Sequence, residues 1–326
     1  MGIQAPAEVK YEIIYKAVQH DNNLLSITYM CKIAGVSHSG YYAWIKAAPL
    51  RQKREEQDLE DFKLILEAYQ FRGFAKGARG IYMRLLHIGI VMNLKKIRRL
   101  MKKYGLACPI RKANPYRRMA KALATNKIAP NIVARDFRQM PRKVLLTDIT
   151  YLFYKDNKCY LSTILDAFTH ELLAYYLSTS LAVDFVLDTV ERLIKEFGST
   201  LDNETIVHSD QGFHYTSYAF IEKLKDAGFV QSMSRKGNCW DNSPQESFFG
   251  HMKDEIATEI AECESFTEVT ELIDDWIDYY NYDRYQWDLL KLSPKEYYKY
   301  TQTGIYPLPI FKQRKNNWGS APDPGV

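Results

Sequence analysis

The sequence has no apolar stretch of the ~20 residues that a membrane-spanning helix needs. Its start, Met1–Pro6, has neither the positive charge nor the apolar run of a signal peptide. Pro6 also stands where an N-myristoylation signal carries serine or threonine. These absences argue against a membrane or secreted protein and predict a cytoplasmic one.

Cysteine is scarce, and its spacing shows no pairing. The five residues form no CxxC motif and have no histidine at zinc-finger distance; they are Cys31, Cys108, Cys159, Cys239 and Cys263. The pattern predicts reduced thiols, with neither a disulfide framework nor a zinc module. Hydrophobic residues make up 46% of the 326 residues, which is enough to build two or three compact units.

Acidic residues are almost absent from one segment, Val91–Lys143, which holds 16 lysines or arginines and one aspartate. Its net charge is +15, whereas the rest of the chain, with 28 basic and 38 acidic residues, carries −10. This uneven distribution is typical of a segment that binds a polyanion.

Small helices are predicted near the start of the chain. Tyr29–Ala34 suits one helix, Gly35–Ser37 a turn and His38–Lys46 a second helix, with Ser37 or Ser39 as its N-cap. This order is typical of a helix-turn-helix, in which the bend carries glycine or another small residue. From these residues alone, an ordinary helical hairpin is equally compatible.

A second helical module is predicted between residues 51 and 105. An amphipathic helix covers 50–70, and Asn93 is placed to cap a helix that runs to Tyr104 and stops at Gly105. The exposed faces of that helix carry six cations without a glutamate partner: Lys95, Lys96, Arg98, Arg99, Lys102 and Lys103. Because like charges one turn apart repel each other, contact with phosphate explains this helix better than a merely solvated face.

A mixed α/β core is predicted from residue 141 onward. Strands are expected at 143–150, 158–165, 171–178, 205–208 and 229–232, and helices at 183–197, 217–227, 266–282 and 293–300, besides a helix around residue 246. Strands first, then alternating helix and strand, is the order of an RNase H-like fold. The predicted division is 1–50 (helix-turn-helix-like module), 51–105 (second helical DNA-binding module), 106–140 (basic linker), 141–300 (core) and 301–326 (tail).

Three carboxylates are the strongest candidates for a site. Asp148 lies in the buried strand Val144–Tyr151, Asp210 directly follows an apolar run, and Glu246 comes after a further 35 residues. Carboxylates held on strand ends and a helix supply the oxygen ligands that Mg²⁺ prefers. Two such ions, roughly 4 Å apart, clamp the attacking and leaving oxygens of a phosphodiester. The pattern therefore indicates cutting or joining of nucleic acid.

Each carboxylate also has a simpler explanation. Asp148 could form a structural salt bridge, and Asp210 an Asx-turn at the strand end. Ser243–Glu246 fits a capping box, in which Glu246 would only close its helix. Against that, Lys253 lies two turns further along the same helix face, where a cation could hold the incoming DNA strand.

Other polar residues near these motifs leave alternatives open. Asp166 ends a predicted strand and is a candidate fourth carboxylate, although turn chemistry explains it at least as well. His208 and His214 flank Asp210, but a strand-end histidine is more often structural. Trp240 lies in a loop rich in glycine and asparagine and could contact an unpaired DNA end.

Several long motifs carry a resemblance to a known family: Lys143–Tyr151, His208–Ser217, Gln231–Gly250, Val36–Trp44 and Tyr279–Arg284. Their order and spacing resemble those of the DDE transposases and retroviral integrases. The match is closest to the insertion-sequence-three family of bacterial transposases, in the protein made from the element's second reading frame. One departure is Leu146, where the family often has tryptophan two residues before the first aspartate.

The resemblance implies a magnesium-dependent transposase, a DDE polynucleotidyl transferase with an RNase H-like core. Asp148 would bridge two Mg²⁺ ions, with Asp210 completing one site and Glu246 the other; Mn²⁺ is the alternative ion. One strand at the element end would be hydrolysed, and the freed 3′-hydroxyl would attack a second phosphodiester.

The expected partner is DNA, both the terminal inverted repeats of the element and the target. Besides the six cations above, the residues expected to contact it are Arg111, Lys112, Arg117, Arg118, Arg235, Lys236 and Lys253. The resemblance also implies a homo-oligomer on DNA, a partner protein from the first reading frame and a place on the bacterial nucleoid. Two other functions stay open: an RNase H-like nuclease, and a non-catalytic DNA-binding regulator derived from a transposase.

Overall fold

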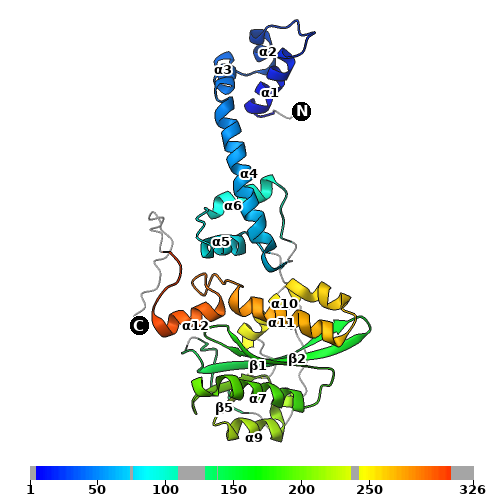
Figure 1. Cartoon of the computed structure of the whole chain (residues 1–326), viewed down its shortest axis with the longest axis vertical. Helices are drawn as coiled ribbons and strands as arrows, with labels where there is room; N and C mark the ends of the chain where they lie inside the picture. The colour runs from blue at the N-terminus through cyan, green and yellow to red at the C-terminus, as the bar shows by residue number, and fades with distance from the viewer. Residues whose placement is uncertain (1–4, 74–75, 109–128, 138, 236–241, 310–326) are drawn as a thin grey trace. The chain divides into compact units, whose positions relative to one another are not determined.

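The computed structural model describes residues 5–73, 76–108, 129–137, 139–235 and 242–309. The chain divides into two compact units, Met1–Leu66 and Glu67–Val326 (Figure 1). Among the described residues, no helix is long and apolar enough to cross a membrane. The five-part division made from the sequence stays a prediction, and much of the basic linker and of the tail lies outside the described residues.

The first unit contains most of a long helix that continues into the second unit, and before it a small helical module of α1 (Ala7–Val18), α2 (Ile27–Ala34) and α3 (His38–Lys46). Gly35 ends α2 with a φ of +64°, a conformation that glycine adopts without strain. Ser37 begins α3 by accepting a hydrogen bond from the Gly40 N–H at 3.0 Å. The two predicted helices and the Ser37 cap are therefore confirmed. The core of the unit holds Ile14, Met30, Cys31 and Tyr41.

The two predicted helices that follow are present as α4 (Ala48–Gln70) and α6 (Leu94–Lys103), and a further helix, α5 (Ala78–His87), lies between them in the sequence. The Asn93 side chain caps α6 by accepting a hydrogen bond from the Lys95 N–H at 2.8 Å. The buried face of α6 consists of Ile97, Leu100 and Met101. With this face packed inward, the cations of α6 are left on its outer faces.

A five-stranded mixed sheet forms the centre of the second unit. Its strands are β1 (Val144–Tyr154), β2 (Asn157–Asp166), β3 (Leu172–Ser178), β4 (Ile206–Ser209) and β5 (Val230–Met233), in the order β3-β2-β1-β4-β5. β1, β2 and β3 are antiparallel neighbours, whereas β4 runs parallel to both β1 and β5. β1 continues beyond the predicted end at residue 150, because its last residues pair with the start of β2 across a tight hairpin.

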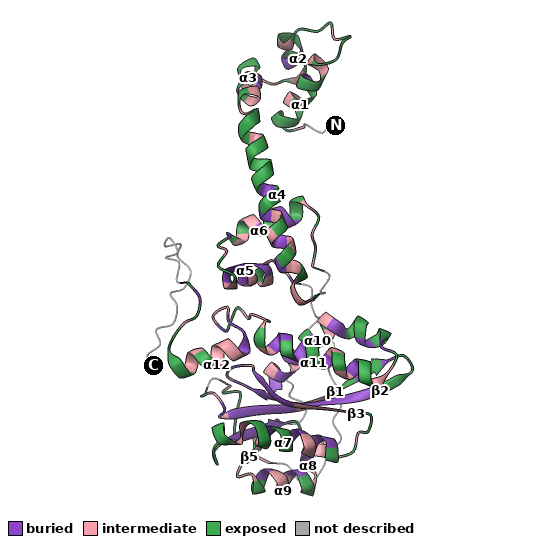
Figure 2. Ribbon diagram, viewed as in Figure 1, coloured by how far each residue is buried: buried purple, intermediate pink, exposed green. Residues whose placement is uncertain are grey.

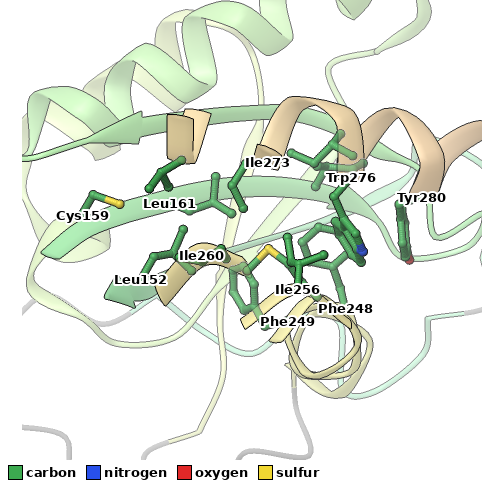
Figure 3. Packing of buried hydrophobic residues seen from close by; sticks show 14 of the residues in the cluster. Leu152, Cys159, Leu161, Phe248, Phe249, Ile256, Ile260, Ile273, Trp276 and Tyr280 are labelled. Carbon is green, nitrogen blue, oxygen red and sulfur yellow. The ribbon is translucent and has the colours of Figure 1, made fainter. Parts of the chain in front are cut away.

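Helices cover both faces of this sheet (Figure 2). α7 (Asp184–Phe197) and α9 (Tyr218–Asp226) lie on one face, and α10 (Ser243–Glu262) and α11 (Phe266–Tyr282) on the other. Because side chains alternate along a strand, Leu145 packs in the α7 cluster, whereas Leu152 packs with Phe248 and Trp276 of α10 and α11 (Figure 3). A mixed sheet between two helical layers confirms the predicted fold class.

Two further helices complete the second unit, α8 (Phe213–Thr216) and α12 (Pro294–Thr303). The segment between α4 and α5 is tied to α11 by Arg72, whose guanidinium lies 2.9 Å from a carboxylate oxygen of Asp275 and 2.9 Å from one of Asp278. A third carboxylate, that of Asp283, lies 3.4 Å away. Several carboxylates around one arginine form a network, which contributes more to the stability of the fold than an isolated surface ion pair does.

Candidate active site

Asp148 lies in the central strand of the sheet, between β2 and β4. It is half-buried, and its Oδ1 accepts a hydrogen bond from the Ile149 N–H at 2.8 Å. Its pairing partner on the neighbouring strand β2 is Thr163, whose side chain is fully buried. Asp148 is paired with β2 and lies two residues beyond the last β1 residue paired with β4, so the sheet holds this carboxylate in a defined place.

Asp210 is the residue that directly follows β4. β4 pairs in parallel with β1, with His208 opposite Leu146, so the chain leaves β4 beside the part of β1 that carries Asp148. The Oδ1 atom of Asp210 accepts a hydrogen bond from the Gly212 N–H at 2.8 Å, which is the predicted Asx-turn. This turn orients the carboxylate without excluding a second role, because a carboxylate has about four acceptor positions.

Glu246 lies in the first turn of α10. The capping box considered from the sequence needs Ser243 as N-cap, but Ser243 is already the first helical residue. Asn242 precedes it, and the Asn242 side chain makes no capping hydrogen bond. The capping box with Ser243 as N-cap is therefore contradicted, because the helix begins one residue earlier than that capping box requires.

The three carboxylates influence one another electrostatically. Burial, followed by the charge of Asp210, raises the pKa of Asp148 to about 7, and Glu246 adds to the rise. Lys253, two turns along α10 from Glu246, acts on Asp148 in the opposite sense. Desolvation also raises the pKa of Asp210, although that residue as a whole is exposed. Negative charge from the end of β4 and from α10 thus gathers around Asp148.

This arrangement fits a hard divalent cation in its chemistry. The donor atoms are carboxylate oxygens, and the raised pKa of Asp148 shows that its ionised form lacks sufficient positive charge nearby. Over the described ranges, no group of three or more acidic, histidine or cysteine side chains already stands in metal-binding geometry.

Asp166 does not join this site. It is paired in register with Leu145, three residues before Asp148, so it lies on the other face of the sheet. Its carboxylate accepts hydrogen bonds from the Arg142 and Phe168 N–H groups and from the Thr169 hydroxyl at 3.2, 3.1 and 2.8 Å. The guanidinium of Arg142 also lies 3.6 Å from it. Turn chemistry and an ion pair thus explain Asp166.

The two histidines have structural contacts, as expected. The Nδ1 atom of buried His208 lies 2.9 Å from the Ser232 hydroxyl of β5. The Nε2 atom of His214 lies 2.9 Å from the Leu181 carbonyl oxygen. These bonds hold the loop that carries Asp210 against its neighbours.

Three further residues lie beside the carboxylates without a recognisable signal in the sequence. Thr163 and Gln245 lie beside Asp148 and Glu246, and the Gln245 amide donates a hydrogen bond to the Thr163 hydroxyl. Tyr215 is buried, and burial together with the charges of Asp148 and Asp210 raises its pKa well above the ordinary value. No local pattern marks these residues, because their roles depend on neighbours far away in the chain.

The candidate DNA-contacting residues fall into two groups. Of the α6 cations, Lys95, Arg98, Arg99, Lys102 and Lys103 are exposed and Lys96 is half-buried; Arg235, two residues after β5, is exposed, and Lys253 on α10 is half-buried. Arg111, Lys112, Arg117, Arg118 and Lys236, like Trp240, lie outside the described residues. Within the +15 segment, the structure therefore describes the position of the candidate DNA-contacting cations on α6.

A mixed sheet with helices on both faces, and with acidic residues on its central strand, after the neighbouring strand and on a covering helix, defines an integrase-type core. Consistent with this, the integrase core domain family matches residues 138–239 and 246–301, and an HTH-like domain family matches residues 56–114.

Several bacterial proteins are similar along most of the chain. The InsK protein for insertion sequence element IS150 of Escherichia coli K12 is 32% identical over 269 residues, 82% of this chain and 92% of that protein. The transposase for insertion sequence element IS904 of Lactococcus lactis is 33% identical over 258 residues, covering 77% and 98%. The catalytic core domain of BIV integrase, a solved structure, is 17% identical with a TM-score of 0.40, covering 50% and 97%. The chain belongs to the insertion-sequence-three family of transposases.

Gly212 offers a direct test of the Asp210 geometry. A Cβ atom at this position would lie 2.8 Å from Asp210 Oδ1, so Gly212→Ala must push the carboxylate aside. We expect DNA cleavage to fall about 10- to 100-fold, since displacements near 1 Å have such effects. Unfolding free energy should change by less than about 1 kcal/mol, because a flexible carboxylate moves easily. Gly198→Ala, whose Cβ meets only an ordinary contact at 3.8 Å, is the control. Unchanged cleavage by Gly212→Ala would contradict a role for the Asp210 position.

Proposed function

We propose that this transposase is a DDE polynucleotidyl transferase in which Asp148, Asp210 and Glu246 form the catalytic centre. The observation that carries the proposal is the convergence of the Asp210 and Glu246 charges on Asp148, where they add to burial in raising its pKa to about 7. The start of α10 supports it, because Ser243 does not occupy the N-cap position that the capping explanation of Glu246 requires. The reaction would be strand cleavage at the ends of an insertion sequence, followed by strand transfer to target DNA.

The three carboxylates would hold two Mg²⁺ ions, or Mn²⁺ in their place, with Asp148 shared between the two sites. When bound, such ions lower the pKa of an attacking water and stabilise the leaving oxygen. Asp148 would be kept in place by the sheet and by the Ile149 N–H, and Asp210 by the Gly212 N–H. Glu246 would approach from α10. Each metal ligand would thus be a carboxylate held by a rigid part of the structure, as precise positioning requires.

Lys253 and the α6 cations would bind the DNA backbone. Lys253 lies on the helix of Glu246, and its charge reaches Asp148, so a phosphate held by Lys253 would lie beside the carboxylates. α6 presents exposed cations along a single helix. We further propose a homo-oligomer on DNA, a first-reading-frame partner protein and, because the substrate is bacterial DNA, a location on the nucleoid.

A strand-joining assay tests the reaction. The protein is incubated with Mg²⁺, a duplex of one element end carrying a free 3′-hydroxyl, and a target plasmid. We expect covalent joining of the 3′ end to the plasmid, visible as labelled high-molecular-weight product. The same duplex with a 3′-deoxy end is the control and should give none, since it lacks the attacking group. Cutting without joining would favour a nuclease, and neither activity would favour a DNA-binding regulator.

A further inference from the structure

The first turn of α10 is fastened to the centre of the sheet by a buried amide. We propose that Gln245 and Thr163 act as a positioning pair, which sets where Glu246 stands relative to Asp148. This inference rests on the proposed function of the three carboxylates. Neither residue is a candidate metal ligand here; both would act through the carboxylates next to them.

The pair forms a short chain of contacts between two of the carboxylates. Gln245 directly precedes Glu246, and its Nε2 donates a hydrogen bond to the Thr163 hydroxyl, 82 residues away in sequence. Thr163 is paired in register with Asp148, and its hydroxyl lies 3.4 Å from the Asp148 carbonyl oxygen, to which it donates. The backbone of Asp148 and the residue before Glu246 are therefore joined through one threonine.

Apolar packing alone would not fix this turn. Phe248, Phe249 and Met252 bury one face of α10, but hydrophobic contacts are not directional and tolerate small shifts along the helix. The Asn242 N-cap adds no side-chain hydrogen bond at the helix start. A hydrogen bond has a preferred length and angle, so the Gln245–Thr163 contact defines the position that packing leaves loose.

The state of the Gln245 side chain also argues for a role beyond stability. Both Gln245 and Thr163 are 0% exposed. Burying the Gln245 amide costs the free energy of its lost hydration, whereas an apolar side chain at this position would carry no such cost. In addition, the Gln245 Oε1 atom is buried without a hydrogen-bond partner. A glutamine kept only for stability is expected to satisfy both of its amide groups. A fixed position for its neighbour Glu246 accounts for an otherwise unfavourable choice.

The experiment compares Gln245→Leu, Thr163→Val, their double variant and Thr163→Ser in the full-length protein. Mg²⁺ binding is titrated by calorimetry without DNA, and cleavage rate, DNA affinity and thermal unfolding are measured alongside.

We expect Gln245→Leu and Thr163→Val each to weaken Mg²⁺ binding and slow cleavage by about 10- to 100-fold, the range for residues that orient metal ligands. The Kd for DNA should stay within about twofold, because no phosphate contact is removed. The double variant should lose no more than either single variant, since both break one bond. Thr163→Ser, which keeps the hydroxyl, should restore both properties.

A matched control separates positioning from stability. Thr189 is equally buried, on α7 across the sheet, and donates to the Phe185 carbonyl oxygen at 2.8 Å. Thr189→Val should lower the unfolding temperature as much as Thr163→Val, yet leave Mg²⁺ affinity unchanged. If the folded Thr163→Val variant bound Mg²⁺ with wild-type affinity, the proposed positioning role of Gln245 and Thr163 would be wrong. It would also be wrong if Thr189→Val lost as much Mg²⁺ affinity as Thr163→Val. If Asp148→Asn and Glu246→Gln also kept full activity, the proposed function itself would be the failure.

Discussion

Asp148→Asn should abolish DNA cleavage and at the same time stabilise the metal-free protein at pH 8. The substitution removes a charge and little volume, so a cation loses a ligand while the fold keeps its packing. Cation stabilisation of a phosphodiester transition state is worth several kcal/mol, so cleavage should fall by about 10³-fold or more. Binding to DNA should persist, because the phosphate-contacting cations are intact.

The stability effect follows from the raised pKa of Asp148, which changes from an ordinary value of 3.8 to about 7 in the folded protein. Folding thus disfavours the ionised form, so without metal the stability falls as pH rises from about 4 to about 7 and then levels off. The shift of about three units corresponds to at most about 4 kcal/mol. In urea unfolding with a chelator, Asp148→Asn should lack this decline. An identical pH dependence in wild type and variant would mean that the carboxylate ionises without penalty.

Asp210→Asn and Glu246→Gln should also abolish cleavage while leaving DNA binding intact. Glu246→Gln is the more informative of the two, because glutamine serves a capping box as well as glutamate does. A cap would therefore survive this change, whereas a metal ligand would not. Near-normal strand transfer by either variant would remove that residue from the catalytic centre.

Replacing Lys95, Arg98, Arg99 and Lys102 of α6 with glutamine should weaken binding to every DNA sequence by about 10³-fold near 0.1 M salt. Each cation that contacts a phosphate releases counterions and adds about 0.9 to the slope of log Kd against log salt concentration. Four lost contacts would lower that slope by up to about 3.6. The measurement is Kd over a salt series for one specific and one unrelated duplex.

The α6 variant should remain folded, because glutamine is a good helix former and the crowding of like charges is relieved. Lys195→Gln with Lys225→Gln provides a control, since both residues are exposed cations on α7 and α9. That control should lower the slope by much less per charge removed. An unchanged slope in the α6 variant would show that this helix face is only solvated and that DNA is held elsewhere.

Local signals in the sequence were enough to predict most of the elements. The cap at Asn93, the bend at Gly35 and the apolar runs around Asp148 and Asp210 depend on neighbours within a few residues. The family motifs then indicated three carboxylates in order. Boundaries were less certain, as β1 shows, because pairing with β2 extended the strand beyond its own apolar pattern.

The sequence by itself determined the elements, the mixed α/β class and the identity of the acidic residues, because these depend on periodicity and short motifs. Only the tertiary structure decided which acids meet. Asp148 and Asp166 both lie on strands, but the register places Asp166 on the opposite face, with Arg142. The helix start at Ser243 decided against the capping box, and the Gln245–Thr163 bond spans 82 residues. Such contacts arise from strand pairing and helix packing between distant segments, and no local pattern in the chain encodes them.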